Sequence, residues 1–129
     1  MPLSTACPKP SPRWVAKAQK RAEEAKQIKA TYAAVDRRDG PSCRVCGARV
    51  GGLGMITKRI HHHIRFRSLG GKHITSNVLS ICPRCDDLLH REGRLMLSGN
   101  ADLVDERGRF CGVTVERLTE SGWQKAGVC

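Results

Sequence analysis

Two pairs of cysteines and a run of histidines are the residues of this sequence whose types and spacing could do chemistry. The pairs are Cys43-Arg-Val-Cys46 and Cys82-Pro-Arg-Cys85, and three consecutive histidines at 61–63 lie between them. Each C-x-x-C turn aims two thiolates at one point, so the two turns together predict a tetrahedral Zn²⁺ site. Four thiolates leave no open position on the metal, so this zinc should be structural. The alternative, a redox dithiol, needs only one pair and a thioredoxin-like setting.

A second set of possible metal ligands follows the second cysteine pair. Asp86 and His90 are four residues apart in a segment with the character of a short helix, so both project from one face. His61, His62 and His63 end an apolar and basic strand expected at 55–60, and they could supply the remaining ligands. Three histidines could also be a tag remnant, but tags are longer and terminal. The order and spacing therefore favour a second metal site.

These residues, taken in order, resemble the HNH endonucleases. The matching stretches are HHIRFRSLGG at 62–71, NVL at 77–79, CPRC at 82–85, and His90, so the resemblance covers about residues 43–92. It implies a small α+β domain of the ββα-metal (His-Me finger) type that hydrolyses DNA phosphodiester bonds with one divalent metal. Two positions depart from the family pattern. Phe66 stands where the family often has proline, and Asp86 stands where many relatives have another ligand histidine.

The resemblance also implies a role for each matching residue. His62 corresponds to the first-strand metal ligand, and His90 to the ligand on the helix. His63 corresponds to the general base that takes a proton from the attacking water. Asn77 corresponds to the motif asparagine, which either fixes the hairpin carrying the base or touches the metal. Asp86 is either a ligand, which would favour Mg²⁺ or Mn²⁺ because a carboxylate is hard, or only a helix N-terminal acid.

The charge distribution indicates a polyanion as the partner. The formal net charge is +11. Residues 1–39 contain nine Lys and Arg and four acidic residues, and residues 40–92 contain nine and three. Residues 93–129 contain five of each. The excess thus lies on the first two thirds of the chain, where Arg65, Arg67 and Lys72 are candidates to bind flanking phosphates. Solvated loop charges, and a generally basic soluble protein, are the alternatives.

The elements that must position these residues can be outlined from the pattern. Residues 1–12 contain four prolines and predict a flexible arm. A basic helix is expected over 13–39, with Ser11 as its N-cap and Asp39-Gly40-Pro41 as its end. Its apolar residues form only a weak stripe, so it either packs on the domain as a solvated helix or contacts DNA. The nuclease domain itself is expected over 40–92.

A β-rich extension is expected over the remaining residues, 93–129. Leu95 and Leu97 alternate with Arg94, Met96 and Ser98, which is typical of a strand. Turns are expected at 99–100 and at 107–108, the second of them before a strand over 109–115. A two- or three-stranded meander is the resulting prediction.

The composition favours a metal-stabilised core and a reducing compartment. Aromatic residues make up only 4% of the chain, and a core this thin usually needs a metal or disulfides. Seven cysteines, an odd number, without a signal peptide favour metal binding in a reducing cytosol, and leave Cys7, Cys111 and Cys129 as free thiols. No apolar run approaches the ~20 residues of a membrane span.

The sequence therefore predicts a metal-dependent HNH endonuclease that acts on double-stranded DNA in the cytoplasm of a bacterial or phage-infected cell. A zinc-knuckle protein that binds nucleic acid without cutting it, and an RNase of the same fold, are the alternatives. The chain has few aromatic residues that could stack on single-stranded bases, so duplex DNA is favoured as the substrate over single-stranded nucleic acid. HNH proteins resembling this chain occur in phages and mobile elements, so a homodimer or a larger phage or mobile-element machine is a further expected partner.

Overall fold

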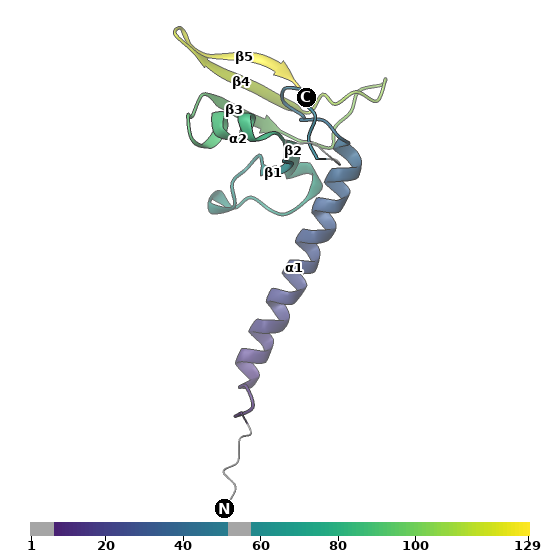
Figure 1. Cartoon of the computed structure of the whole chain (residues 1–129), viewed down its shortest axis with the longest axis vertical. Coiled ribbons are helices and arrows are strands. Elements are labelled where there is room, and N and C mark those ends of the chain that lie inside the picture. Colours follow the sequence, from purple (N-terminus) through teal and green to yellow (C-terminus); the bar gives the residue numbers. More distant parts are fainter. Residues whose placement is uncertain (1–6, 52–57) are drawn as a thin grey trace, which may run out of the picture.

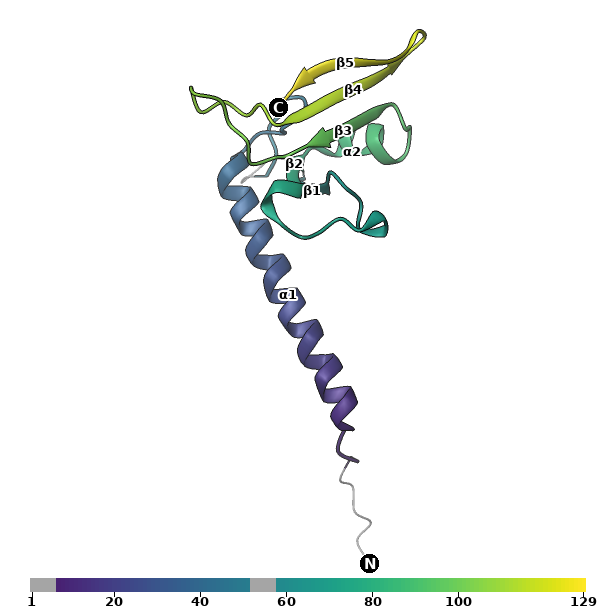
Figure 2. The same cartoon turned by 180° about the vertical axis from the view of Figure 1, so that it is seen from behind.

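A long helix leads from the N-terminal side into a small body of mixed helices and strands. The computed structural model describes residues 7–51 and 58–129. Helix α1 (Pro12–Asp39) projects from the body along most of its length, and Figures 1 and 2 show this from opposite sides. Within the described ranges, no helix has the length and apolar character needed to cross a membrane.

The body contains a two-stranded antiparallel sheet, a helix and a three-stranded antiparallel sheet. Strands β1 (Ile60–His63) and β2 (Val78–Ile81) pair, and α2 (Pro83–His90) follows β2 directly. Two single-turn helices, η1 (Arg67–Leu69) and η2 (Thr75–Asn77), lie in the loop between the two strands. The second sheet has the order β3 (Leu95–Gly99), β4 (Val113–Thr119), β5 (Gly122–Val128). The expected α+β class is confirmed, with a ββα unit and a three-stranded meander.

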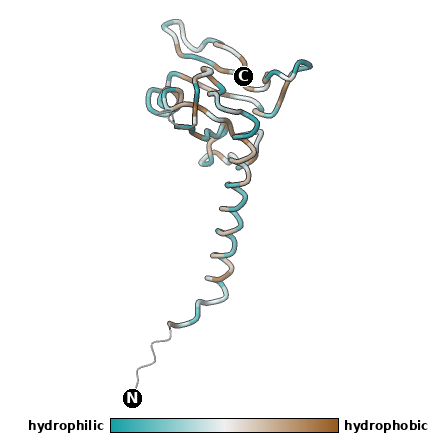
Figure 3. The backbone as a smooth tube through the Cα atoms, turned by 45° about the vertical axis from the view of Figure 1, so that its right-hand side comes forward, coloured by the Kyte–Doolittle hydropathy of each residue, from teal (hydrophilic) through white to brown (hydrophobic). Residues whose placement is uncertain are grey.

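Helix α1 begins and ends where its sequence predicts. Ser11 caps the helix, since its side chain accepts a hydrogen bond from the backbone N–H of Trp14, and Pro12 occupies the first turn. Gly40, with φ at 65°, ends it. Residues 12–27 are exposed, whereas Val35 is fully buried against the body. Figure 3 shows the mostly hydrophilic course of the projecting part.

The last turn of α1 is fixed to the body by a buried ionic network. The Asp39 carboxylate has no exposed surface and accepts hydrogen bonds from Arg38, Arg44 and the backbone N–H of Ser80 in β2. Burial raises the pKa of Asp39, but these hydrogen bonds outweigh it and hold the pKa below its ordinary value. Arg38 also donates to the carbonyl oxygens of Thr75 and Val78, at 2.6 Å each. The helix end and β2 are therefore held as one unit.

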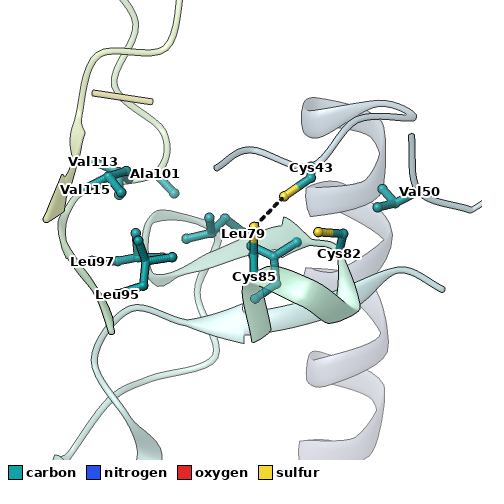
Figure 4. Close-up of a cluster of buried hydrophobic side chains, with 11 residues drawn as sticks. Cys43, Val50, Leu79, Cys82, Cys85, Leu95, Leu97, Ala101, Val113 and Val115 are labelled. Atoms are coloured by element: carbon teal, nitrogen blue, oxygen red, sulfur yellow. Dashed lines mark hydrogen bonds between the residues drawn. The ribbon is translucent and has the colours of Figure 1, made fainter. Parts of the chain in front are cut away.

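The core is continuous between the ββα unit and the second sheet, and cysteines form part of it (Figure 4). The ββα side and the turn before it contribute Cys43, Val50, Leu79, Ile81, Cys82 and Cys85; the second sheet and its loop contribute Leu95, Leu97, Ala101, Val113 and Val115. These side chains are small, as the low aromatic content requires. A core built this way depends on what holds its cysteines together.

One strand prediction needs correction, and half of another lies outside the described residues. The strand expected at 55–60 includes residues 55–57, which the structure does not describe; Lys58 and Arg59 are not in a strand, and β1 begins at Ile60. The Arg59 side chain donates to Ser80 Oγ and to the Gly40 carbonyl. The strand expected at 109–115 begins at Val113. Before it, the Asp105 carboxylate accepts hydrogen bonds from the backbone N–H groups of Arg107 and Arg109 and builds a turn instead.

Candidate active site and metal centres

The four paired cysteines converge on one point. Their sulfurs lie within 4.8 Å of one another, and none is in a disulfide. Cys43 Sγ is 3.8 Å from Cys85 Sγ, the contact drawn in Figure 4, and Cys46 Sγ is 3.6 Å from Cys82 Sγ. A tetrahedron with Zn–S bonds of about 2.3 Å has S···S edges of about 3.8 Å. The donor set thus fits a four-coordinate zinc.

The electrostatics of this cluster also call for a cation. Burial and then the neighbouring Cys43 sulfur raise the pKa of the Cys85 thiol. Four sulfurs this close cannot all ionise unless a positive charge sits among them, and thiolates are the form that binds metals. The cysteine cluster can therefore bind zinc as a structural ion, with no open position for a substrate.

The histidine side chains of strand β1 lie on its two opposite faces. Alternation along a strand places His62 on one face and its two neighbours on the other. His62 is 3% exposed and faces α2, with its Nδ1 atom 3.2 Å from His90 Nε2. His61 instead bonds Asp36 through Nε2, at 2.6 Å, and stacks on Tyr32 of α1. His61 and His63 therefore share the face of β1 that is turned to Tyr32 of α1, and within this run it is His62 that faces α2.

His62, Asp86 and His90 form a second group that could hold a metal ion. Their ligand atoms lie within 4.8 Å of one another. Asp86 and His90 are one turn apart on α2, with His90 Nε2 3.4 Å from the Asp86 carboxylate. Neighbouring ligands of an octahedral ion with bonds near 2.1 Å are about 3.0 Å apart, so the separations of 3.2 and 3.4 Å suit a divalent metal.

The protonation state of His62 suits a ligand. Burial, the neighbouring His90 and the neighbouring His63 lower its pKa to about 4. The imidazole is therefore neutral at pH 7 and offers a lone pair to a metal. Asp86 supplies the one carboxylate of the set, which makes the donor chemistry harder than that of a histidine-only site.

His63 shares a cavity with these ligands. The cavity has a volume of about 300 Å³ and is lined by His61, His62, His63, Phe66, Arg67, Ser68, Asp86 and His90. We refer to it as the active-site cavity. Burial and the charges of His73 and Arg67 lower the pKa of His63, so its imidazole is neutral near pH 7. A neutral imidazole beside a group of metal ligands can accept a proton from water.

His73 was not predicted and is the closest partner of His63. Its Nδ1 atom lies 2.8 Å from His63 Nε2, and the two rings meet edge to face at 4.6 Å. The backbone carbonyl of His73 accepts a hydrogen bond from Thr31 of α1, which fixes this part of the loop. No metal-ligand spacing and no helical or strand period marks His73 in the sequence, so only the folded loop reveals the contact.

Asn77 fixes the loop between β1 and β2. Its side-chain oxygen accepts a hydrogen bond from the backbone N–H of Arg65, and its amide donates to the carbonyls of Arg65 and Lys72. Asn77 is not in the group of three metal ligands. Of the two roles that the sequence left open, these contacts correspond to fixing the hairpin. Gly71 allows the loop to close, since a Cβ there would lie 1.7 Å from the Arg65 carbonyl oxygen.

The three candidate phosphate ligands lie in different settings. Arg67 lines the active-site cavity and also a second hollow between the loop and α1. Lys72 lines that second hollow and is exposed. The Arg65 guanidinium donates through Nε to the carbonyl of Leu69 within its own loop. Arg67 is therefore the candidate that lines the active-site cavity together with His62, Asp86 and His90, whereas Arg65 and Lys72 line a separate cavity with His62.

The comparison with known families agrees with this geometry. Residues 43–92 match the family model described as HNH endonuclease. No curated protein and no solved structure shows significant similarity to the chain. The matched segment begins at Cys43, includes both groups of ligands and ends two residues after His90; α1 and the β3–β5 sheet lie outside it. Residues 43–92 of this chain thus match the HNH endonuclease family model and contain four clustered cysteines.

Proposed function

We propose that the protein is a metal-dependent endonuclease that hydrolyses phosphodiester bonds of double-stranded DNA. The observation that carries the proposal is the convergence of His62, Asp86 and His90 beside His63 in one cavity. The basic excess on residues 1–92 supports a polyanionic substrate. The family match supports nuclease activity in general.

Each group in the cavity has a proposed task. His62, Asp86 and His90 hold one Mg²⁺ or Mn²⁺ ion. When bound, such an ion supplies Lewis-acid stabilisation of charge on the phosphate. His63 accepts the proton of the attacking water through its neutral imidazole, and His73 orients the ring. Asn77 holds the loop that carries the candidate phosphate ligand Arg67.

The zinc site has a separate, structural task. Cys85 and Asp86 are adjacent on α2, so four thiolates on one Zn²⁺ hold the helix that presents Asp86 and His90. Two metals of different chemistry are therefore proposed: zinc on the cysteines and a harder ion on His62, Asp86 and His90. A bacterial or phage-infected cytoplasm is the proposed setting, with a phage or mobile-element machine or a second copy of the chain as a further partner.

The test is nicking of supercoiled plasmid with Mg²⁺ or Mn²⁺, and again with a chelator. We expect metal-dependent nicking by the unmodified chain. His63→Ala should lower the rate about 10²- to 10⁴-fold, the usual contribution of a general base, and leave zinc content and DNA affinity in place. The comparison variant is His61→Gln, at the histidine that bonds Asp36 and stacks on Tyr32 of α1; because His61 also lines the cavity, its rate should fall, but by less than that of His63→Ala.

Three results would contradict the proposal. Equal nicking rates for His63→Ala and the unmodified chain would show that His63 is not the general base. DNA binding without any nicking would select the zinc-knuckle binding protein instead. Faster cleavage of an RNA duplex than of a DNA duplex of the same sequence would make the enzyme an RNase. In the same assay, Asp86→Ala should raise the Mn²⁺ concentration needed for nicking; an unchanged requirement would reduce Asp86 to a helix N-terminal acid.

A further inference from the structure

We propose that the projecting part of α1 binds the phosphate backbone of the duplex on one side of the cut. The proposal concerns four cations that share one side of the helix; we call this side the basic face, made of Arg13, Lys17, Lys20 and Arg21. It rests on the proposed function, since it assumes a duplex in the active-site cavity. It adds the side of the cut on which the helix binds DNA and the length of duplex that it contacts.

The docked end of α1 fixes which way the basic face points. Val35 is fully buried against the body, and Tyr32 stacks on His61 and meets His63 and His73 edge to face. Successive residues of an α-helix turn by about 100°, because 3.6 residues complete a turn. On this basis all residues of the basic face lie within about 60° of the direction of Val35. They therefore point to the side of the helix that carries the body and the active-site cavity.

The other lysines of the helix provide a natural contrast. Lys26 lies about 180° and Lys29 about 120° from the direction of Val35. Both are exposed, as the basic face is. The cations are thus not spread evenly around the helix: on its outer turns they gather on the side of the active-site cavity.

The basic face has no partner within the described part of the chain. Residues 12–27 are exposed throughout, and no ion pair in residues 7–51 and 58–129 involves Lys17, Lys20 or Arg21. Among residues 12–27, Glu24 is the one acid within 60° of the direction of Val35, by the same turn per residue, so the face keeps an excess of positive charge. A helix that folded only to pack on the body would not need these turns.

A hollow lies between the active-site cavity and the turn of α1 that follows the basic face. It has a volume of about 300 Å³ and lies between α1, at Glu24 and Ile28, and the loop at Arg67 and Lys72. Arg67 lines both this hollow and the active-site cavity. Arg67 and Lys72 therefore lie between the active-site cavity and the outer turns of α1, and Glu24 stands between them and Arg21, the nearest cation of the basic face along the helix. Arg67, Lys72 and the basic face, together called the track, suit the phosphates of one duplex arm.

The length of the track sets how much DNA it can follow. Fifteen residues separate Ile28 from Arg13, which is about 22 Å of helix at 1.5 Å per residue. With one phosphate per 3.4 Å on a strand, this corresponds to about six or seven base pairs. The helix would therefore bind the backbone up to about that distance from the edge of the cavity, on one side only.

The experiment compares two double variants of equal charge, without added divalent metal so that the DNA stays intact. Lys17→Gln/Arg21→Gln removes two cations from the basic face, and Lys26→Gln/Lys29→Gln removes two from the far side. Binding to a duplex is measured from 50 to 200 mM salt. Two lost phosphate contacts should lower the slope of log K against log salt by about 1.8, so the affinity ratio between the unmodified chain and the first variant should change about 12-fold over this range.

The control variant should keep the slope of the unmodified chain. Equal slopes for both double variants, or an unchanged slope for the first, would overturn the proposal. A chain that sediments as a dimer, and that dissociates in the first variant, would assign the face to a second copy and would also overturn it. Nicking by the unmodified chain is measured separately. A slope difference without nicking would refute the nuclease activity and support DNA binding by the basic face. Nicking with equal slopes would support the nuclease activity and refute DNA binding by the basic face.

Discussion

Removing one cysteine of the zinc site is expected to unfold the ββα unit. Cys85→Ser is the clearest choice, because Cys85 is 3% exposed and belongs to the core. Structural zinc contributes about 10–16 kcal/mol of apparent binding energy that is also folding energy. A domain of this kind has a total stability of about 5–15 kcal/mol. Losing most of the zinc-binding free energy would therefore cancel or exceed the total stability of the domain.

The structure makes this loss larger than that of an ordinary core cysteine. Three of the eleven buried residues in the core cluster are zinc-site cysteines. Asp86 follows Cys85 directly on α2, so Asp86 and His90, the proposed metal ligands on this helix, lose their support together with the zinc. Excess Mg²⁺ should not restore nicking to this variant.

The assay combines metal content with folding. The unmodified chain should carry one tightly held zinc and should give a cobalt–sulfur charge-transfer band when Co²⁺ replaces it. A histidine and carboxylate site gives no such band, so the two metal centres are distinguished. Cys85→Ser should lose the band and the cooperative thermal transition. Cys111→Ser, an exposed cysteine outside the cluster, is the matched control and should keep both.

The reasoning is refuted if Cys85→Ser retains zinc and the melting temperature of the unmodified chain. It is also refuted if the unmodified chain melts at the same temperature with and without a chelator, because the core would then be stable without any metal.

Two further substitutions test the support around the site. Asp39→Ala leaves Arg38 and Arg44 without their buried partner and should lower the free energy of unfolding by about 3–5 kcal/mol in chemical denaturation; Asp105→Ala, on an exposed pair, should leave the unfolding midpoint in place. Gly71→Ala forces the Arg65 carbonyl away and should reduce nicking with zinc content unchanged, whereas Gly127→Ala meets no atom within 4 Å and should nick normally. An active Gly71→Ala enzyme would mean that the loop need not close as observed.

Much of the fold could be predicted from local signals. The start of α1 is encoded by Ser11 and Pro12, and its end by Gly40, because capping depends on neighbouring residues. The cysteine pairs and the spacing of Asp86 and His90 likewise predict the two groups of ligands that the structure brings together.

What could not be predicted depends on contacts distant in sequence. Asp39 reads as a polar residue at a helix end, yet it is buried by Ser80, forty-one residues away. His61 reads as a possible metal ligand, yet Asp36 and Tyr32 of α1 hold it. His73 carries no periodic signal at all. Such pairings follow from how α1 packs on the body, and no local pattern records that packing.

The outer turns of α1 bury no side chain, and this frees them from the constraint that governs the rest of the chain. A substitution in residues 12–27 removes nothing from the core, so selection on the proposed DNA contact there is uncoupled from selection on folding. Even the length of this part can vary. Removing seven residues shortens the helix by about 10 Å but rotates what remains by only about 20°. If the proposed DNA contact holds, the span of DNA bound by α1 is a property that evolution can adjust in steps of two turns, without altering the ββα unit.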